Sequence, residues 1–313
     1  FVLMQGVVIK STGSWYIVKT DDGELLNCRI RGKFRMQDIK STNPIVVGDK
    51  VLLSQEEDSF LIDDLFDRKN IIVRKSVNLS KQTHIIASNI DQAILIVTMQ
   101  SPQTSTGFID RFLVSAQAYG VEVVILFNKT DLFDKATLVL LEERRSIYEK
   151  IGYSCLSKSI LNDDLSDIKE LMKGKVNVIT GHSGVGKSTL LNSIQPNLNI
   201  TTQEISEQHQ QGQHTTTFSE MYDLDFGASI IDTPGVRGFG LIEMDKYELG
   251  DYFIEFFMLK SDCKFNNCLH INEPKCAVKL ALENGEIAPS RYKNYLNMLE
   301  QDEESFRINR YEK

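Results

Sequence analysis

The segment GHSGVGKS, residues 181–188, has the spacing of a loop that binds the phosphate groups of a nucleotide. An apolar run at 176–180 precedes it and a helical pattern follows, which is the context such a loop needs. Glycines let backbone N–H groups turn toward phosphate oxygens, and the helix N-terminus adds partial positive charge. We expect Lys187 to reach the β- and γ-phosphates and the Ser188 hydroxyl to bind Mg²⁺. The predicted phosphate-binding residues are Gly181, His182, Ser183, Gly184, Val185, Gly186, Lys187, Ser188 and Thr189.

A second set of residues that could bind metal and phosphate follows, where DTPG, residues 232–235, comes directly after the strand-like segment SII at 229–231. Asp232 is expected to hold Mg²⁺ through water, and the backbone amide of Gly235 to contact the γ-phosphate. Three threonines lie between this segment and the phosphate-binding loop. In GTPases one threonine here binds Mg²⁺ only while the γ-phosphate is present, so the loop acts as a switch. We assign this role to Thr216, with Thr215 as the alternative.

The sequence NKTD, beginning at Asn128, predicts recognition of guanine. The Asp131 carboxylate can accept hydrogen bonds from N1–H and the 2-amino group of guanine, whereas adenine offers neither donor there. We expect Asn128 to meet the opposite edge of the base and the Lys129 stem to lie along its face. After a further short strand, the backbone of Ser157–Lys158 is expected to contact guanine O6. Four residues are a weak motif alone, but this one ends the buried run at 121–127 of a chain with a phosphate-binding loop.

Four potential zinc ligands occur within 14 residues near the C-terminus: Cys263, Cys268, His270 and Cys276. Three thiolates and one imidazole suit tetrahedral Zn²⁺, and four protein ligands are typical of a structural rather than a catalytic site. A small polar region with little apolar surface would draw much of its folding free energy from such an ion. Unligated thiols are the alternative, because the spacing is not the common paired form.

The pattern of hydrophobicity divides the chain into three parts that must position these groups. Residues 1–80 contain four or five short strands and predict a small β-barrel of the OB type. Residues 81–245 alternate buried strands with helices, which predicts a doubly wound α/β domain that binds ligands beyond the carboxyl ends of its strands. Residues 246–313 are helical and polar and contain the Cys/His cluster.

The bulk composition excludes several classes of protein. A hydrophobic share of 42% and a charged share of 25% are those of a globular protein. No apolar run approaches the roughly 18 residues of a membrane span and no secretory signal is evident, so we expect a cytoplasmic protein without a membrane partner. The net charge of −8 argues against indiscriminate coating of nucleic acid.

Two basic stretches are nevertheless candidates for contact with RNA. RIRGKFR at 29–35 places four cations on a strand-to-loop edge of the predicted barrel, and DRKNIIVRK at 67–75 adds more. Nearby aromatic rings such as Trp15, Tyr16 or Phe34 could stack on bases. The alternatives are a solvated hairpin and, for Trp15, a place in the barrel core or on its surface.

The order of the motifs is unusual, because the guanine-recognition motif precedes the phosphate-binding loop. This order resembles that of circularly permuted GTPases. Together with the β-rich N-terminal part and the Cys/His cluster, it resembles the RsgA family of small ribosomal subunit biogenesis GTPases. The segments that carry the resemblance are NIDQAILIV, FIDRFLVSA, NKTDL, GHSGVGKSTLLN, GQHTTT and DTPGVRGFGL.

The resemblance implies an OB-fold RNA-binding domain, a circularly permuted P-loop GTPase domain and a C-terminal helical zinc-binding domain. It also implies GTP hydrolysis with GTP/GDP, Mg²⁺ and one structural Zn²⁺, stimulated by the small ribosomal subunit and its rRNA late in maturation. We expect a monomer in the unbound state.

The catalytic machinery departs from that of many GTPases. Val236 follows Gly235 where many GTPases place the glutamine that orients water, so His214 becomes the candidate for this role. The alternative for His214 is a merely solvated side chain. Gly184 stands where potassium-activated GTPases have asparagine. The predicted catalytic residues are therefore Lys187, Thr216 and His214.

Two other functions are compatible with parts of the pattern. An ATP-using P-loop enzyme would share the phosphate-binding loop, although Asp131 argues against it. A non-catalytic RNA-binding scaffold would bind nucleotide without hydrolysis. Because the Cys/His region directly follows DTPG, we also expect the nucleotide state to move the C-terminal region relative to the core.

Overall fold

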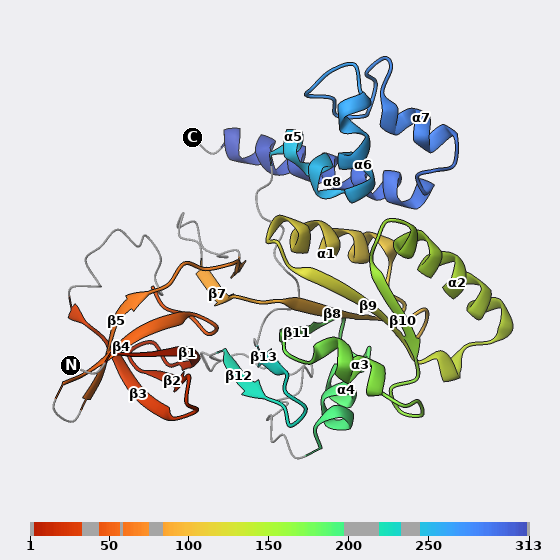
Figure 1. The fold of residues 1–313 in the computed structure, drawn as a ribbon. Helices are drawn as coiled ribbons and strands as arrows, with labels where there is room; N and C mark the ends of the chain where they lie inside the picture. Colours follow the sequence, from red (N-terminus) through yellow and green to blue (C-terminus); the bar gives the residue numbers. More distant parts are fainter. Residues whose placement is uncertain are drawn as a thin grey trace.

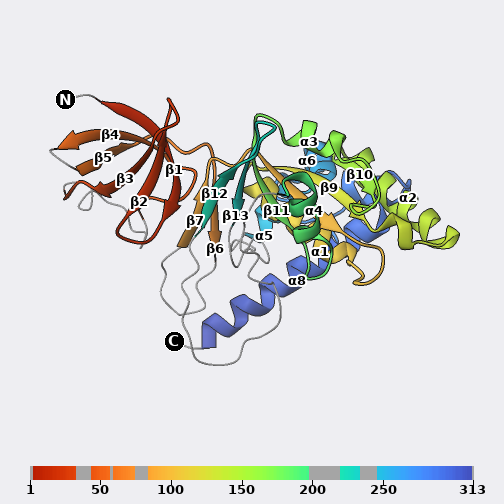
Figure 2. The ribbon, with the colours of Figure 1, turned by 90° about the horizontal axis from the view of Figure 1, so that it is seen from below.

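The computed structural model describes residues 3–32, 44–56, 59–74, 84–196, 219–232 and 245–311. They form a β-barrel, an α/β layer structure and a group of C-terminal helices (Figure 1). In a view from below, the barrel lies at one end and helix α8 extends away from the sheet (Figure 2). None of the described helices has the length and apolar character that crossing a bilayer needs.

The barrel is built from five short strands whose order closes on itself. The order is β1-β2-β3-β5-β4, and β4 pairs back onto β1. All pairings are antiparallel except β3 with β5, which is parallel. Alternate side chains point inward, so Val8, Tyr16 and Val18 lie in one core. The strands are β1 (Met4–Ser11), β2 (Tyr16–Thr20), β3 (Leu25–Ile30), β4 (Lys50–Glu56) and β5 (Ser59–Leu65).

A two-stranded hairpin, β6 (Ile71–Arg74) and β7 (His84–Ser88), connects the barrel to the α/β part. The joint is a buried ion pair, because Asp49 of the barrel is fully buried and accepts a hydrogen bond of 2.7 Å from Arg68 Nε. Asp49 also accepts a bond of 2.6 Å from the Ser88 hydroxyl. Arg68, which belongs to the second basic stretch, therefore serves this joint.

We predict that Gly48→Ala loosens this joint. Gly48 has φ +95°, and a Cβ there would lie 2.0 Å from the carbonyl oxygen of Ser88. The matched control is Gly23→Ala, because Gly23 has φ +90° but no atom within 4 Å of its Cβ position. The control should lose about 1–2 kcal/mol of stability from backbone strain, and Gly48→Ala roughly 1–3 kcal/mol more from the clash. Urea unfolding followed by Trp15 fluorescence, the single tryptophan, measures the difference. Equal losses would contradict the prediction.

The α/β part contributes six strands to an eleven-stranded sheet, which continues through the pairing of β12 with β1 into the barrel. This six-stranded portion has helices on both faces. Its order is β10-β9-β8-β11-β13-β12, and all pairings are parallel except β12 with β13. Helices α1 and α2 cover one face, and α3 and α4 the other (Figure 1). The strands are β8 (Gln92–Val97), β9 (Glu122–Asn128), β10 (Ser154–Lys158), β11 (Val176–Thr180), β12 (Glu220–Asp223) and β13 (Ser229–Asp232). The helices are α1 (Thr106–Ala118), α2 (Lys135–Lys150), α3 (Ser166–Met172) and α4 (Lys187–Ile194), with the 3-10 turn η2 (Thr130–Leu132).

The parallel strands explain how distant motifs come to one place. Strands β8, β9, β10, β11 and β13 all end at the same edge of the sheet. Asn128 ends β9, and Lys158 ends β10 directly opposite it. Helix α3 connects β10 to β11, which leads into the phosphate-binding loop.

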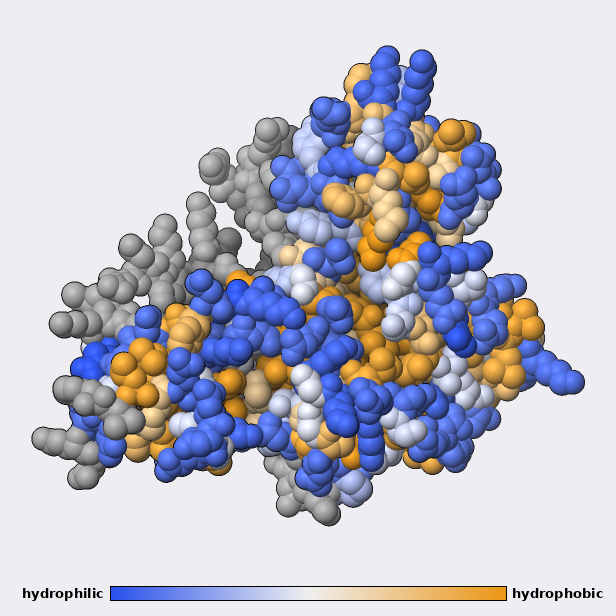
Figure 3. All heavy atoms as spheres, viewed as in Figure 1, coloured by the Kyte–Doolittle hydropathy of each residue, from blue (hydrophilic) through white to orange (hydrophobic). Residues whose placement is uncertain are grey.

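The C-terminal helices pack on the outer side of α1 (Figure 1). Val114 of α1 belongs to the same buried cluster as Phe253, Phe256 and Tyr295. The elements are α5 (Lys246–Leu249), η3 (Gly250–Tyr252), α6 (Ile254–Leu259), η4 (Lys260–Asp262), α7 (Ala277–Glu283) and α8 (Pro289–Tyr311). Over the face drawn in Figure 3, hydrophilic residues cover most of the helices and barrel, and apolar surface gathers in the middle of the view.

Sequence patterns place the buried strands and the helices of the α/β part within two residues of their observed ends but miss three short strands. Strands β6, β7 and β12 are not predicted, because each is short and follows a polar segment. A tight turn is predicted at Gly48–Asp49, and a turn is observed there. There the Asp49 carboxylate accepts the Val46 N–H at 2.8 Å, a local bond that competes with strand pairing.

Candidate nucleotide and metal sites

The phosphate-binding loop passes so close to neighbouring strands that only glycine fits at two positions. Gly181 has φ +142°, and a Cβ there would lie 2.3 Å from the carbonyl oxygen of Ile96 on β8. Gly186 has φ +111°, and a Cβ there would lie 2.4 Å from Asn128 Nδ2. The loop therefore has the tight curvature that turns backbone N–H groups toward an anion at the start of α4. This cradle fits the phosphates of a nucleotide.

Lys187 lies across the mouth of this loop. Its Nζ donates hydrogen bonds to the carbonyl oxygens of Gly181 at 2.8 Å and His182 at 2.6 Å. These bonds place the ammonium group over the loop rather than out in solvent. A cation in this position faces the side on which phosphate oxygens would bind.

Asn128 joins the guanine-recognition motif to the phosphate-binding loop. Its Nδ2 donates to the carbonyl oxygen of Val185 at 2.7 Å, and its Oδ1 accepts the N–H of Ile160 at 3.0 Å. The side chain is 4% exposed, so both bonds lie in the protein interior. Three loops that follow three different strands are thus held together by one amide group. Nδ2 carries a second hydrogen, and the predicted contact of Asn128 with the base remains a prediction.

The other residues of the guanine motif lie at the surface. Lys129 has a left-handed backbone, φ +68°, and its Nζ donates to the carbonyl oxygen of Ser101 in the loop after β8. Asp131 is exposed in η2. Asp131 lies three residues after Asn128, which contacts the phosphate-binding loop, so its exposed carboxylate is accessible to the edge of a base.

Lys158, the last residue of β10, has its side chain bound to α3 and to the segment before it. Lys158 Nζ forms an ion pair with Asp167 of α3 at 2.8 Å and donates to the carbonyl oxygen of Asp164 at 3.1 Å. The hydrogen bond to Asp167 raises the pKa of Lys158. Ser157 Oγ is buried and has no hydrogen-bond partner among the described residues. The side chain of Lys158 is therefore held by α3, which leaves the predicted base contact to the backbone.

Only some of the residues that are predicted to bind Mg²⁺ and the γ-phosphate are among the described residues. Ser188 lies in the first turn of α4, and β13 ends at Asp232 at the same sheet edge. The side chain of Asp232 lies outside the described part. So do His214, Thr215, Thr216, Gly235 and Val236. Their predicted roles remain predictions.

Sequence reasoning missed Phe108, a neighbour of the phosphate-binding loop, and Ser101, whose carbonyl oxygen accepts from Lys129. The Phe108 ring of α1 lies against the His182 ring, with centroids 3.8 Å apart and planes inclined by 32°. Burial, and then the charge of Lys187, lower the pKa of His182. An aromatic residue in the first turn of a helix gives no sequence signal for such a contact, because it depends on how α1 lies relative to β11.

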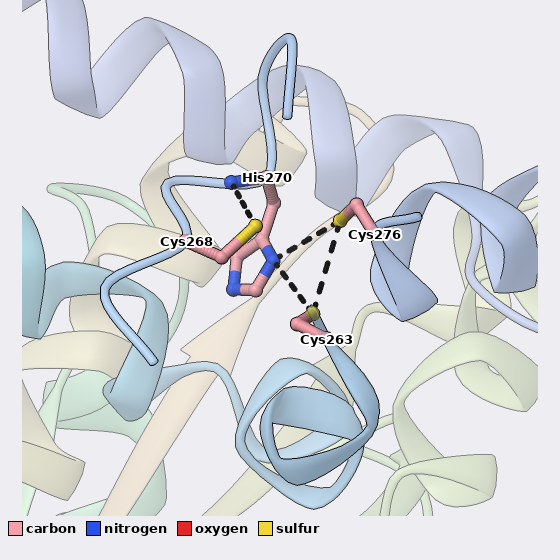
Figure 4. Close-up of side chains that lie close together, drawn as sticks. All are labelled: Cys263, Cys268, His270 and Cys276. Atoms are coloured by element: carbon pink, nitrogen blue, oxygen red, sulfur yellow. Dashed lines mark hydrogen bonds between the residues drawn. The ribbon is translucent and has the colours of Figure 1, made fainter. Parts of the chain in front are cut away.

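The Cys/His residues converge into one buried cluster (Figure 4). Their ligand atoms all lie within 4.8 Å of one another. His270 Nδ1 is 3.7 Å from Cys263 Sγ and 3.3 Å from Cys276 Sγ, and these two sulfurs are 4.0 Å apart. Tetrahedral zinc with Zn–S bonds of about 2.3 Å requires sulfur atoms about 3.8 Å apart. The donor set and its spacing therefore fit Zn²⁺.

Surrounding groups orient these ligands. The backbone N–H of His270 points at Cys268 Sγ at 3.4 Å, and that of Lys279 at Cys276 Sγ at 3.5 Å, where Cys276 caps α7. The Tyr292 hydroxyl donates to the carbonyl oxygen of His270 at 2.6 Å. Hydrogen bonds of this kind to the ligand residues hold thiolates and imidazole in place around an ion.

Only some of the barrel residues that are predicted to contact RNA are placed where they can do so. Trp15 is 44% exposed, and the Arg29 guanidinium lies 3.8 Å from the centroid of its ring. Arg31, in contrast, is paired with Glu56 at 2.7 Å and with Asp63. Tyr16 is 2% exposed in the barrel core, so the prediction that it could stack on a base is wrong. Phe34 lies outside the described residues.

A surface pocket of the barrel surrounds the Trp15–Arg29 pair. It is lined by Ser14, Trp15, Arg29, Ile30 and Gly32. An aromatic ring beside a guanidinium is a suitable platform for a nucleic-acid base, since the ring stacks and the cation attracts phosphate.

Comparison with known proteins gives two matching family models that cover most of the chain. The model described as RsgA GTPase matches residues 65–242, and that described as RsgA N-terminal domain matches residues 5–60. A Christiangramia forsetii protein named small ribosomal subunit biogenesis GTPase RsgA is 56% identical over 99% of this chain and 100% of its own. A Bacteroides fragilis protein of the same name is 53% identical over 96% of this chain and 98% of its own.

Two solved structures have the same fold over nearly the whole chain. YjeQ from Thermotoga maritima superposes with a TM-score of 0.80 at 36% identity and covers 96% of this chain and 98% of its own. YloQ, described as a circularly permuted GTPase, gives 0.78 at 31% identity, with 97% and 96% covered. The closed five-stranded barrel and the strand order of the α/β part agree with the OB-fold and the permuted GTPase domain that the resemblance implies. The chain therefore belongs to the RsgA family of circularly permuted GTPases.

Proposed function

We propose that this GTPase acts in late maturation of the small ribosomal subunit and hydrolyses GTP when bound to that subunit. The observation that carries the proposal is the junction at Asn128, which joins a guanine-recognition motif to a phosphate cradle. The curated relatives, which match over nearly their full length, are named for biogenesis of this subunit. Such a factor works in the cytoplasm, as a monomer before it binds.

The hydrolysis requires few groups because phosphoryl transfer depends mainly on positioning and charge stabilisation. Water attacks the γ-phosphorus while the bond to the β,γ-bridging oxygen breaks, and GDP and phosphate leave. Backbone N–H groups of 181–189 and Lys187 Nζ would hold the phosphate oxygens. Ser188, Thr216 and Asp232 would bind Mg²⁺, which neutralises charge between the β- and γ-phosphates. His214 would orient the attacking water.

Base selection would use the exposed end of the motif. Asp131 would accept the two donors of guanine, Asn128 would meet the other edge, and the Lys129 stem would cover the ring. The backbone of Ser157–Lys158 would contact O6, and the Gly235 amide the γ-phosphate.

The two flanking regions would bind the ribosomal partner. The barrel, within 1–80, would contact rRNA through Arg29 and Trp15. The C-terminal region, 246–313, would fold around one structural Zn²⁺ held by the Cys/His cluster. Residues 81–245 form the GTPase domain in this proposal.

The test is GTP hydrolysis with and without purified small subunits. We expect a slow basal rate and strong stimulation by the subunit, and ATP in place of GTP should give neither. Absence of stimulation would favour the non-catalytic scaffold, and equal turnover of ATP would favour the rival P-loop enzyme.

We predict that Lys187→Ala lowers the subunit-stimulated rate by about 10²-fold or more, since a charged group aimed at the transferring phosphoryl group is lost. Lys150→Ala, at an exposed position ending α2, is the matched control and should keep the full rate. A full rate for Lys187→Ala would refute the assignment of the phosphate-binding loop.

A further inference from the structure

Two residues near the start of helix α1 make different contacts. One lies against the phosphate-binding loop and the other binds the C-terminal helices. Phe108, in its first turn, lies against His182, whose carbonyl oxygen holds Lys187 Nζ at 2.6 Å. Two positions later, Asp110 faces α8. An α-helix turns by about 100° per residue, so these two side chains leave α1 about 200° apart. The helix is therefore held from opposite sides.

Asp110 is the centre of a buried polar network. Its carboxylate is fully buried and accepts hydrogen bonds from Arg291 Nη1 at 2.8 Å, Asn294 Nδ2 at 2.6 Å and the Tyr148 hydroxyl at 2.9 Å. Burial raises the pKa of Asp110, while Arg291 and Asn294 act in the opposite direction. Both α8 and α2 thus hold one carboxylate of α1.

Arg291 connects this network to the rest of the C-terminal region. It is 1% exposed, and Glu255 of α6 accepts from its Nε at 2.7 Å and from its Nη2 at 3.0 Å. Its guanidinium also lies over the Phe253 ring, 4.5 Å from the centroid. One guanidinium is shared between two buried carboxylates on different helices, so a shift of α8 along α1 would leave a buried charge unpaired. Such a network favours the observed arrangement of the helices.

The same helix α8 holds the Cys/His cluster from the other side. The Tyr292 hydroxyl donates to the carbonyl oxygen of His270, and the Tyr295 hydroxyl donates to that of Leu269 at 2.8 Å. A continuous series of contacts therefore runs from the Cys/His loop through α8 and α1 to the phosphate-binding loop. None of these contacts involves the threonine or DTPG segments.

We propose that Phe108 is a positioning residue for nucleotide binding, and that the docking of α8 on Asp110 sets its place against His182. The Phe108 ring holds His182 in the orientation in which its backbone carbonyl receives Lys187. The C-terminal helices thereby support the conformation of the phosphate-binding loop through α1. The inference rests on the proposed role of Lys187 but not on the ribosomal partner.

The first experiment measures the affinity of the isolated full-length protein for a fluorescent GDP derivative, together with KM and kcat for GTP. Phe108→Leu should weaken GDP binding and raise KM by about 10-fold, within the range usual for coupled sites. Phe108→Tyr keeps the ring and should restore both values. Phe112→Leu is the matched control, because Phe112 lies on the same helix in the core against the sheet. Unchanged affinity in Phe108→Leu, or an equal loss in Phe112→Leu, would overturn the role of Phe108.

The second experiment tests the link to α8 with a double-mutant cycle. Asn294→Leu removes one hydrogen bond to Asp110 and keeps the ion pair with Arg291, so the chain should fold, which circular dichroism verifies. We expect Asn294→Leu to weaken GDP binding about 5-fold. The double variant should bind GDP only slightly more weakly than Phe108→Leu alone. Unchanged GDP affinity in Asn294→Leu, or simple multiplication of the two effects, would show that α8 does not act through Phe108. If Asn294→Leu does not fold, Asn294→Ser takes its place in the cycle. Failure of Lys187→Ala to lower hydrolysis would instead refute the proposed site itself.

Discussion

Asp131→Asn is expected to reverse the base preference of the site from GTP to xanthosine triphosphate. A carboxylate accepts from both N1–H and the 2-amino group of guanine, whereas an asparagine amide presents a donor to one of these groups. Xanthine carries an oxygen in place of the 2-amino group, so the amide can donate to that oxygen and accept from N1–H. Sites that hydrogen-bond a substrate group discriminate by about 10⁴-fold against analogues that cannot pair. We expect a change of this order in the ratio of GTP to xanthosine triphosphate kcat/KM.

The matched control for this variant lies three residues further along the chain. Asp134 is exposed like Asp131, and its carboxylate caps α2 by accepting the Thr137 N–H at 2.8 Å. Asparagine caps helices equally well, so Asp134→Asn should preserve both stability and base preference. Competition between the two nucleotides in a steady-state assay gives the ratio directly. A preference for GTP in Asp131→Asn that matches the parent chain would rule out Asp131 as the base-selecting residue.

Loss of the metal is expected to unfold the C-terminal helices while leaving the barrel intact. Structural Zn²⁺ contributes about 10–16 kcal/mol to the folding of small zinc domains. Without an ion, the loop from Cys263 to Cys276 retains little buried apolar surface of its own. A strong chelator, or the variant Cys276→Ser, should therefore lower the helical signal in circular dichroism and expose α6 to α8 to protease. Trp15 fluorescence should not change, because this side chain directly precedes β2 and lies against Arg29 of the barrel.

A control variant distinguishes the loss of a zinc ligand from the loss of any buried thiol. Cys155 is also buried but lies in β10, far along the chain from the Cys/His cluster, so Cys155→Ser is the control. Metal analysis should find one zinc per chain in the parent and in the control, and none in Cys276→Ser. Helical content that is unchanged after complete removal of zinc would contradict a structural role for the ion.

Local patterns in the sequence predict most of the fold because they report short-range physics. Continuous apolar runs at 92–98 and 176–180 predict strands covered on both faces, and both are observed in the core of the sheet. Strand β12 is missed because four residues carry too little periodicity to distinguish them from a loop.

Charged residues show the limit of such patterns. Arg29, Arg31 and Arg68 look alike in the sequence, and all three were candidates for RNA contact. The fold pairs Arg31 with Glu56 and Asp63, and Arg68 with the buried Asp49. Only Arg29 among these three lies on an exposed aromatic ring. Which cation meets a carboxylate depends on strand register and closure of the barrel, and neither is encoded within a window of seven residues.

By itself the sequence determined which donors and acceptors the two candidate sites offer, since GHSGVGKS, NKTD and the Cys/His spacing each bring them together within a few residues. It also determined the family, because several such motifs occur in one unusual order. Only the tertiary structure decided that Asn128 bonds to Val185 and that Phe108 lies against His182. The reversed order of the motifs has no effect on this junction. Parallel strands present their carboxyl ends at one edge whatever their order along the chain, and contacts across that edge arise only when the sheet has formed.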